Sequence, residues 1–84
     1  MLLAIDVGNS ETKLGFFEGE ELSHTWRVRT IRERTADEYG TLLASLFRSR
    51  ALELRRVERV AISSVVPQTE RELARAVQSA FRCE

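Results

Sequence analysis

Residues 2–7 constrain the fold more than any other stretch, because this run is apolar on both faces of an extended strand. Only the small Ala4 and the carboxylate of Asp6 interrupt it. A strand of this kind is typically buried on both faces, which predicts a central position in a sheet. Since the buried strand ends in a carboxylate, the sequence also suggests a site at that end.

Two more strands are predicted directly after the first. Residues 12–17 alternate between apolar and mixed positions, and residues 18–20 supply a turn. Residues 22–29 alternate more regularly and place four side chains on one half-buried face: Leu22, His24, Trp26 and Val28. His24 has no second ligand type at metal-binding spacing, which favours a core or edge position over a metal ligand.

Two helices and a fourth strand are predicted in the rest of the chain. Thr35 and Glu38 have capping-box spacing, and so do Thr69 and Glu72, which follow Pro67. The first helix carries its apolar stripe to about residue 48 at Ala36, Tyr39, Leu42, Leu43, Leu46 and Phe47. The second helix carries its stripe at Leu73, Ala74, Val77, Ala80 and Phe81. Residues 57–66 between them predict a buried strand parallel to the first.

The predicted order is β-β-β-α-β-α, an α/β fold with a mixed sheet. The first three strands would form a meander, and the fourth would enter through a helical crossover. The sheet would have an open edge beside the fourth strand, where an apolar strand is not normally left. The unit therefore looks unfinished.

Length and composition limit the functions that this chain can have. A chain of 84 residues forms one domain at most, and its formal net charge of zero argues against a nucleic-acid partner. No apolar run is long enough to span a bilayer, and the N-terminus lacks the features of a signal peptide. Cys83 is the only cysteine, so no intrachain disulfide can form. A cytoplasmic location without membrane attachment is the expectation.

The stretch between the first two strands has the chemistry of a phosphate site. It contains Asp6, Val7, Gly8, Asn9, Ser10, Glu11, Thr12 and Lys13. Backbone N–H groups in a tight turn can converge on an anion, and Gly8 would allow the turn and a close approach. Asp6 would reach a phosphate through Mg²⁺. Residue chemistry alone supports this interpretation and that of an ordinary hairpin turn about equally.

Other charged groups are weaker candidates. Arg29, Arg32 and Arg34 could contact an anionic ligand, but solvated loop arginines are the safer interpretation. Asp37 and Glu38 are interpreted as residues of a helix start, where acidic groups favour the positive end of the helix dipole, and not as a catalytic pair.

Residues 6–15 resemble the first phosphate motif of type III pantothenate kinases, in the superfamily of actin-like ATPases, sugar kinases and heat-shock ATPases. Residues 26–30, 32–39 and 62–67 are similar to the same family, so the likeness covers nearly the whole chain. Ser10 stands where threonine is commoner, which keeps the hydroxyl. The resemblance implies a partial ribonuclease H-like (actin-like ATPase) lobe over residues 1–84, nucleotide-binding and N-terminal, with the second lobe absent.

The resemblance also implies an activity: ATP-dependent phosphorylation of pantothenate, the first step of coenzyme A biosynthesis. The segment from Asp6 to Lys13 would wrap the ATP phosphates, with Asp6 holding Mg²⁺, and the family implies a homodimer that requires K⁺ or NH₄⁺. The pantothenate-binding Gly-x-Asp-Arg motif does not occur in these 84 residues. No catalytic residue is therefore assigned, and the chain alone is expected to be inactive. The alternative is a non-catalytic module of the same fold for association or regulation.

Overall fold

The computed structural model describes residues 1–81, and Cys83 lies outside them. The elements follow the predicted order, with one short 3-10 helix added: β1 (Leu2–Val7), β2 (Glu11–Glu18), β3 (Glu21–Arg29), α1 (Ala36–Ser49), η1 (Leu54–Arg56), β4 (Arg59–Ser64) and α2 (Pro67–Phe81). The sheet order is β3-β2-β1-β4, with β4 parallel to β1 and the other pairs antiparallel. The mixed α/β fold and the central position of β1 are confirmed.

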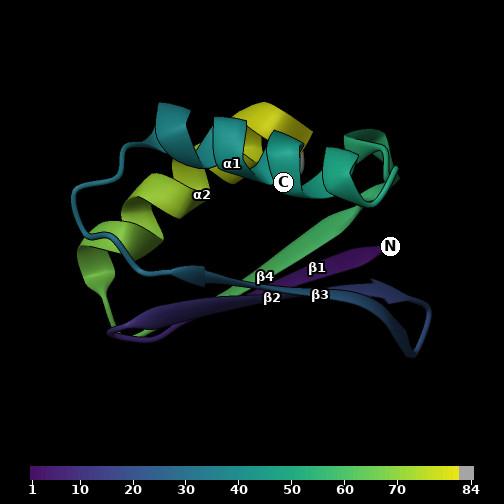
Figure 1. The fold of residues 1–84 in the computed structure, drawn as a ribbon, viewed down its shortest axis with the longest axis horizontal. Coiled ribbons are helices and arrows are strands. Elements are labelled where there is room, and N and C mark those ends of the chain that lie inside the picture. Colours follow the sequence, from purple (N-terminus) through teal and green to yellow (C-terminus); the bar gives the residue numbers. More distant parts are fainter. Residues whose placement is uncertain (82–84) are drawn as a thin grey trace.

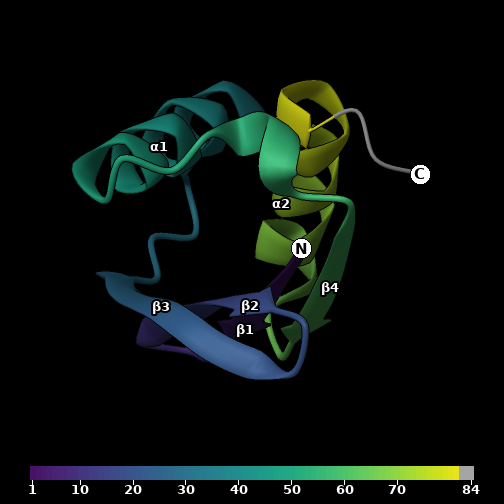
Figure 2. The same cartoon turned by 90° about the vertical axis from the view of Figure 1, so that its right-hand side faces the viewer.

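Both helices lie over the same face of the sheet (Figures 1 and 2). Side chains of β1 alternate accordingly: Leu3, Ile5 and Val7 are buried, whereas Asp6 is exposed. No element within residues 1–81 covers the opposite face, which we call the bare face.

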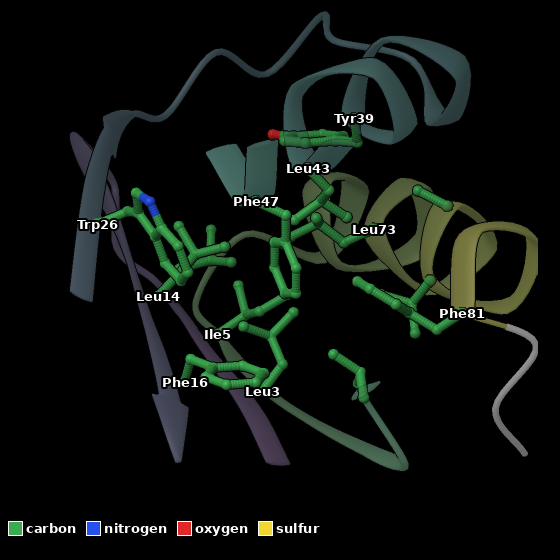
Figure 3. Packing of buried hydrophobic residues seen from close by; sticks show 14 of the residues in the cluster. Leu3, Ile5, Leu14, Phe16, Trp26, Tyr39, Leu43, Phe47, Leu73 and Phe81 are labelled. Carbon is green, nitrogen blue, oxygen red and sulfur yellow. The ribbon is translucent and has the colours of Figure 1, made fainter. Parts of the chain in front are cut away.

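The core between the sheet and the helices centres on Phe47 of α1 (Figure 3). Its ring stacks on Trp26 with a centroid distance of 5.4 Å and meets Phe16 edge-on at 5.7 Å. Phe81 of α2 packs against the same ring at 5.7 Å. One aromatic side chain thus joins two strands and both helices.

The predicted buried face of the third strand is wrong at one position. Phe16 pairs with His24 but Phe17 pairs with Leu22, so Ser23 forms an irregularity in the β2–β3 ladder. Leu22 consequently lies against Gly15 on the bare face and is 49% exposed. An extra residue reverses the facing of every position beyond it.

The second predicted capping box is also wrong. The helix begins at Pro67, so Thr69 lies inside its first turn and is buried. Proline is favoured at the first helical position, because its missing N–H would have no partner there. Glu72 caps the other helix instead, accepting a hydrogen bond from the N–H of Ala36 at 2.9 Å.

Two predicted burial patterns need correction as well. β4 is shorter than residues 57–66 and only half buried, because it lies at the sheet edge and the helices cover one of its faces. On α2, Ala74 is exposed and Ala76 is buried in its place. The orientation of α2 against α1 and the sheet decides which alanine is buried. The spacing of apolar residues along the sequence does not indicate that orientation.

Candidate functional site

The eight predicted site residues lie together where β1 turns into β2. The N–H of Gly8 donates to the carbonyl of Glu11 at 2.9 Å, which closes the turn. A Cβ on Gly8 would lie 3.1 Å from that carbonyl oxygen, and the Gly8 backbone does not adopt a positive φ. Close approach between the two arms, and not a left-handed conformation, therefore favours glycine here.

Asn9 and Ser10 form the exposed tip of this turn. Their backbone N–H groups make no hydrogen bond to any other residue of the described part of the chain. Unpaired, exposed N–H groups in a turn are the donors with which proteins bind anions. The N–H of Gly8 is occupied by Glu11, so the two tip residues offer the free backbone donors.

Asp6 and Lys13 lie on the bare face beside the turn. They are directly paired across β1 and β2, and Ser63 of β4 is the neighbour of Asp6 on the other side. Arg27 of β3 pairs with Lys13, so four polar residues cross the sheet in one row. The row combines one carboxylate, one hydroxyl and two cations, which suits a metal ion together with a polyanion.

Two predicted site residues face the opposite side of the sheet. Val7 and Thr12 are buried on the helix side, where their side chains face the core. Glu11 is partly buried, and its carboxylate lies 3.8 Å from the Nε of Arg27. The side chains of Val7 and Thr12 therefore do not share the exposed surface of Asp6, Asn9 and Lys13.

Thr30, for which the sequence pattern indicated no role, supports the turn from the end of β3. Its hydroxyl donates to the carbonyl of Gly8 at 2.9 Å and lies 2.8 Å from the hydroxyl of Thr12. Its N–H donates to the carbonyl of Ser10 at 2.9 Å. The alternating pattern of residues 22–29 could have indicated a residue in this position. A third strand antiparallel to the second must end beside the turn between the first two strands.

The three loop arginines have separate positions. Arg32 reaches the tip, where its Nη2 donates to Oδ1 of Asn9 at 3.0 Å. This contact occupies the amide oxygen of Asn9 and leaves its NH₂ group available to a ligand. Arg34 lies over the ring of Tyr39, 5.4 Å from its centroid, and Arg29 is exposed at the end of β3.

The acidic pair on α1 belongs to the helix start, as predicted. Glu38 accepts from the N–H of Thr35 at 2.8 Å, and the Thr35 hydroxyl accepts from the N–H of Glu38 at 3.2 Å. The bond from the Thr35 N–H lowers the pKa of Glu38 from its usual value of 4.5, and the bond with the Thr35 side chain adds to the effect. The capping box is thus confirmed.

His24 packs among aromatic rings, with centroids 6.0 Å from Phe16 and 6.1 Å from Trp26. Within residues 1–81, no group of three or more His, Cys, Asp or Glu side chains is placed to hold a metal ion. A metal at this site would accordingly depend on Asp6 together with ligand oxygens.

No described helix is long and apolar enough to cross a membrane.

A groove of about 560 Å³ runs along the bare face from the polar row. Its middle is floored by small residues from three strands, Ala4, Gly15 and Ala61, and its far end is walled by Phe17 and Leu22. The groove is therefore polar at the turn end and apolar at the other.

Comparison with known proteins gives a consistent result. The family model described as type III pantothenate kinase matches residues 2–84. A type III pantothenate kinase of Solibacter usitatus is 49% identical over 81 residues, 96% of this chain and 31% of that protein. One of Anaeromyxobacter dehalogenans is 60% identical over 67 residues, 80% of this chain and 26% of that protein. The chain spans about a third or less of the curated relatives it matches.

Proposed function

The chain belongs to the type III pantothenate kinase family, and from that premise we propose that it supplies the ATP phosphate-binding part of a pantothenate kinase. The reaction is the ATP-dependent phosphorylation of pantothenate, the first step of coenzyme A biosynthesis, in the cytoplasm. One observation carries the assignment: the free N–H groups of Asn9 and Ser10 lie at the tip of a turn flanked by Asp6 and Lys13.

Each site residue has a role that its position permits. The backbone N–H groups of Asn9 and Ser10 and the Asn9 amide donate to phosphate oxygens, and the Lys13 ammonium neutralises charge. Phosphoryl transfer depends mainly on such positioning and electrostatic stabilisation. Gly8 allows the two arms of the turn to approach, while Val7, Glu11 and Thr12 hold them in place.

Asp6 is the proposed Mg²⁺ ligand, directly or through water. The donor set fits, because Mg²⁺ commonly binds one or two protein carboxylates and takes its other ligands from water and substrate phosphates. Bound Mg²⁺ would neutralise phosphate charge. The proposal includes a homodimer and a monovalent cation, K⁺ or NH₄⁺, for which no residue is assigned.

Calorimetric titration of the chain with Mg·ATP tests the phosphate assignment. We expect Asp6→Ala to weaken binding by about tenfold or more, the effect of losing one charge-assisted contact. Asp37→Ala is the matched control, because it removes an exposed carboxylate from α1. Equal heats for the wild type and Asp6→Ala would contradict the assignment.

Catalysis by the 84-residue chain alone is not expected. Asp37 and Glu38 lie at the start of α1 and Glu70 in the first turn of α2, and none of them belongs to a Gly-x-Asp-Arg motif. Phosphopantothenate formed by the purified chain from pantothenate with Mg·ATP and K⁺ would overturn this expectation.

The second candidate function is association without catalysis. The observation that favours it is the edge position of β4, which within residues 1–81 pairs with β1 alone. Exposed strand edges recruit other strands through main-chain hydrogen bonds. We take a second copy of this chain as the partner.

A further inference from the structure

We propose that Thr30 is a positioning residue for the tip of the β1–β2 turn and that the buried Thr12 hydroxyl completes a relay behind it. The proposal deepens the proposed function, because the ordered tip is the part assigned to ATP phosphates. The proposed hydrogen-bond relay rests only on contacts among residues 8–12 and Thr30.

The direction of the hydrogen bonds follows from counting protons. A threonine hydroxyl has one proton, and that of Thr30 is donated to the Gly8 carbonyl at 2.9 Å. The 2.8 Å contact between the two hydroxyls must then use the proton of Thr12. The relay runs from Thr12 to Thr30 to the Gly8 carbonyl, and each donor polarises the next.

The planarity of the peptide unit links this relay to the ligand side of the turn. In a trans peptide, the carbonyl of Gly8 and the N–H of Asn9 point in opposite directions. Thr30 holds that carbonyl, so the N–H of Asn9 is directed away from Thr30. This N–H is one of the two tip donors without a partner in the described chain.

The backbone of Thr30 fixes the other end of the tip. Its N–H donates to the Ser10 carbonyl at 2.9 Å, so one residue holds the carbonyls on both sides of Asn9. Arg32 holds the Asn9 side chain at 3.0 Å. The connection after β3 therefore acts as a brace, and Thr30 is its central contact.

Two substitutions of Thr30 distinguish the contribution of its hydroxyl from that of the rest of its side chain. Thr30→Val keeps the shape and removes the donor, whereas Thr30→Ser keeps the donor. Thr25→Val is the matched control, because Thr25 lies on β3, the strand that leads to Thr30, and its hydroxyl takes part in no hydrogen bond of the described chain. The measurements are ¹⁵N order parameters of Asn9 and Ser10 without nucleotide and the Kd for Mg·ATP.

In Thr30→Val, we expect these order parameters to fall from about 0.85, a rigid backbone, towards about 0.6. We expect Mg·ATP affinity to fall about fivefold to tenfold, which corresponds to one neutral hydrogen bond. Thr30→Ser and Thr25→Val should retain the wild-type values within about twofold in affinity. An unchanged tip in Thr30→Val would overturn the proposal, even if the affinity fell.

Thr12→Val tests the relay if Thr30→Val does not fold. It replaces the buried hydroxyl by a methyl group of similar size and leaves the Thr30 contact with Gly8 intact. A loss of order at Asn9 relative to the wild type supports the relay, and a tip identical to the wild type contradicts it. Failure of the wild-type chain to bind Mg·ATP would instead contradict the proposed function, so the two results are separable.

Discussion

The capping box of α1 shows how one hydrogen-bonded carboxylate makes stability depend on pH. The Thr35 N–H stabilises the ionised form of Glu38 in the folded chain and lowers its pKa. A lowered pKa means that the folded state binds this proton more weakly than the unfolded state. The resulting stabilisation is present above the usual pKa of 4.5 and is lost as the pH falls through the folded-state pKa.

Glu38→Gln should therefore flatten the acid side of the stability profile. Glutamine retains an acceptor for Thr35 but has no carboxylate to protonate. We expect the free energy of unfolding to fall less between about pH 6 and about pH 3 in the variant than in the wild type. Urea unfolding at several pH values measures this change in the free energy of unfolding. Glu33→Gln removes an exposed carboxylate outside the capping box, and an equal flattening in that control would contradict the explanation.

At the element scale, two glycines should respond to alanine with opposite signs. Gly40 lies inside α1, and a Cβ there would meet no atom within 4 Å, so close packing does not require glycine. Gly40→Ala should stabilise the chain by about 1 kcal/mol through helix propensity. Gly19 has φ of 65°, so Gly19→Ala should destabilise it by about 1 kcal/mol, although a Cβ has open space.

Thermal or urea unfolding of both variants provides the measurement, and each glycine serves as a control for the other. Added bulk alone predicts the same small effect at both sites, since neither Cβ meets a neighbour within 4 Å. A loss of stability in Gly40→Ala would show that this helix position is constrained by something other than propensity.

The sequence predicted most elements because their signals are local. The apolar run of residues 2–7 indicated a central strand, and the Thr35–Glu38 spacing indicated the start of α1. The facing of Leu22 could not be predicted, since the irregularity at Ser23 depends on pairing with β2. The cap that Glu72 provides to α1 could not be predicted either, because Glu72 and its partner Ala36 are 36 residues apart in sequence.

The candidate site was partly predictable for the same reason. The order of residue types from Asp6 to Lys13 indicated a turn with donors, a carboxylate and a cation. The burial of Thr12 and the brace formed by Thr30 depend on how three strands align. These contacts join residues far apart in sequence, and the spacing within one strand does not specify them.

At the scale of the whole molecule, the layers are incomplete on one side within residues 1–81. Two helices cover one face of the sheet, and β4 forms one of its edges (Figure 2). Residues of β4 are alternately exposed and half-buried. Val65, just after β4, is 66% exposed. Two copies could pair through β4 about a twofold axis, which would extend the sheet with the same patch on both partners.

An antiparallel pair centred near Ala61 would place the two copies of this residue opposite or diagonal to each other. Ala61→Lys would then bring like charges together on the bare face, where cross-strand repulsion is destabilising. We expect the dimer Kd to rise by about threefold to tenfold. Sedimentation velocity over a range of concentrations measures this change.

Gln78→Lys is the matched control, since it adds the same charge to an exposed position of α2, away from the sheet edge. Its dimer Kd should stay within about twofold of the wild type, because the proposed contact involves strands only. An equal rise in both variants would assign the effect to net charge and contradict pairing through β4. A well-folded wild-type chain that stays monomeric at all concentrations would exclude the association function itself and leave nucleotide binding as the role of the fold.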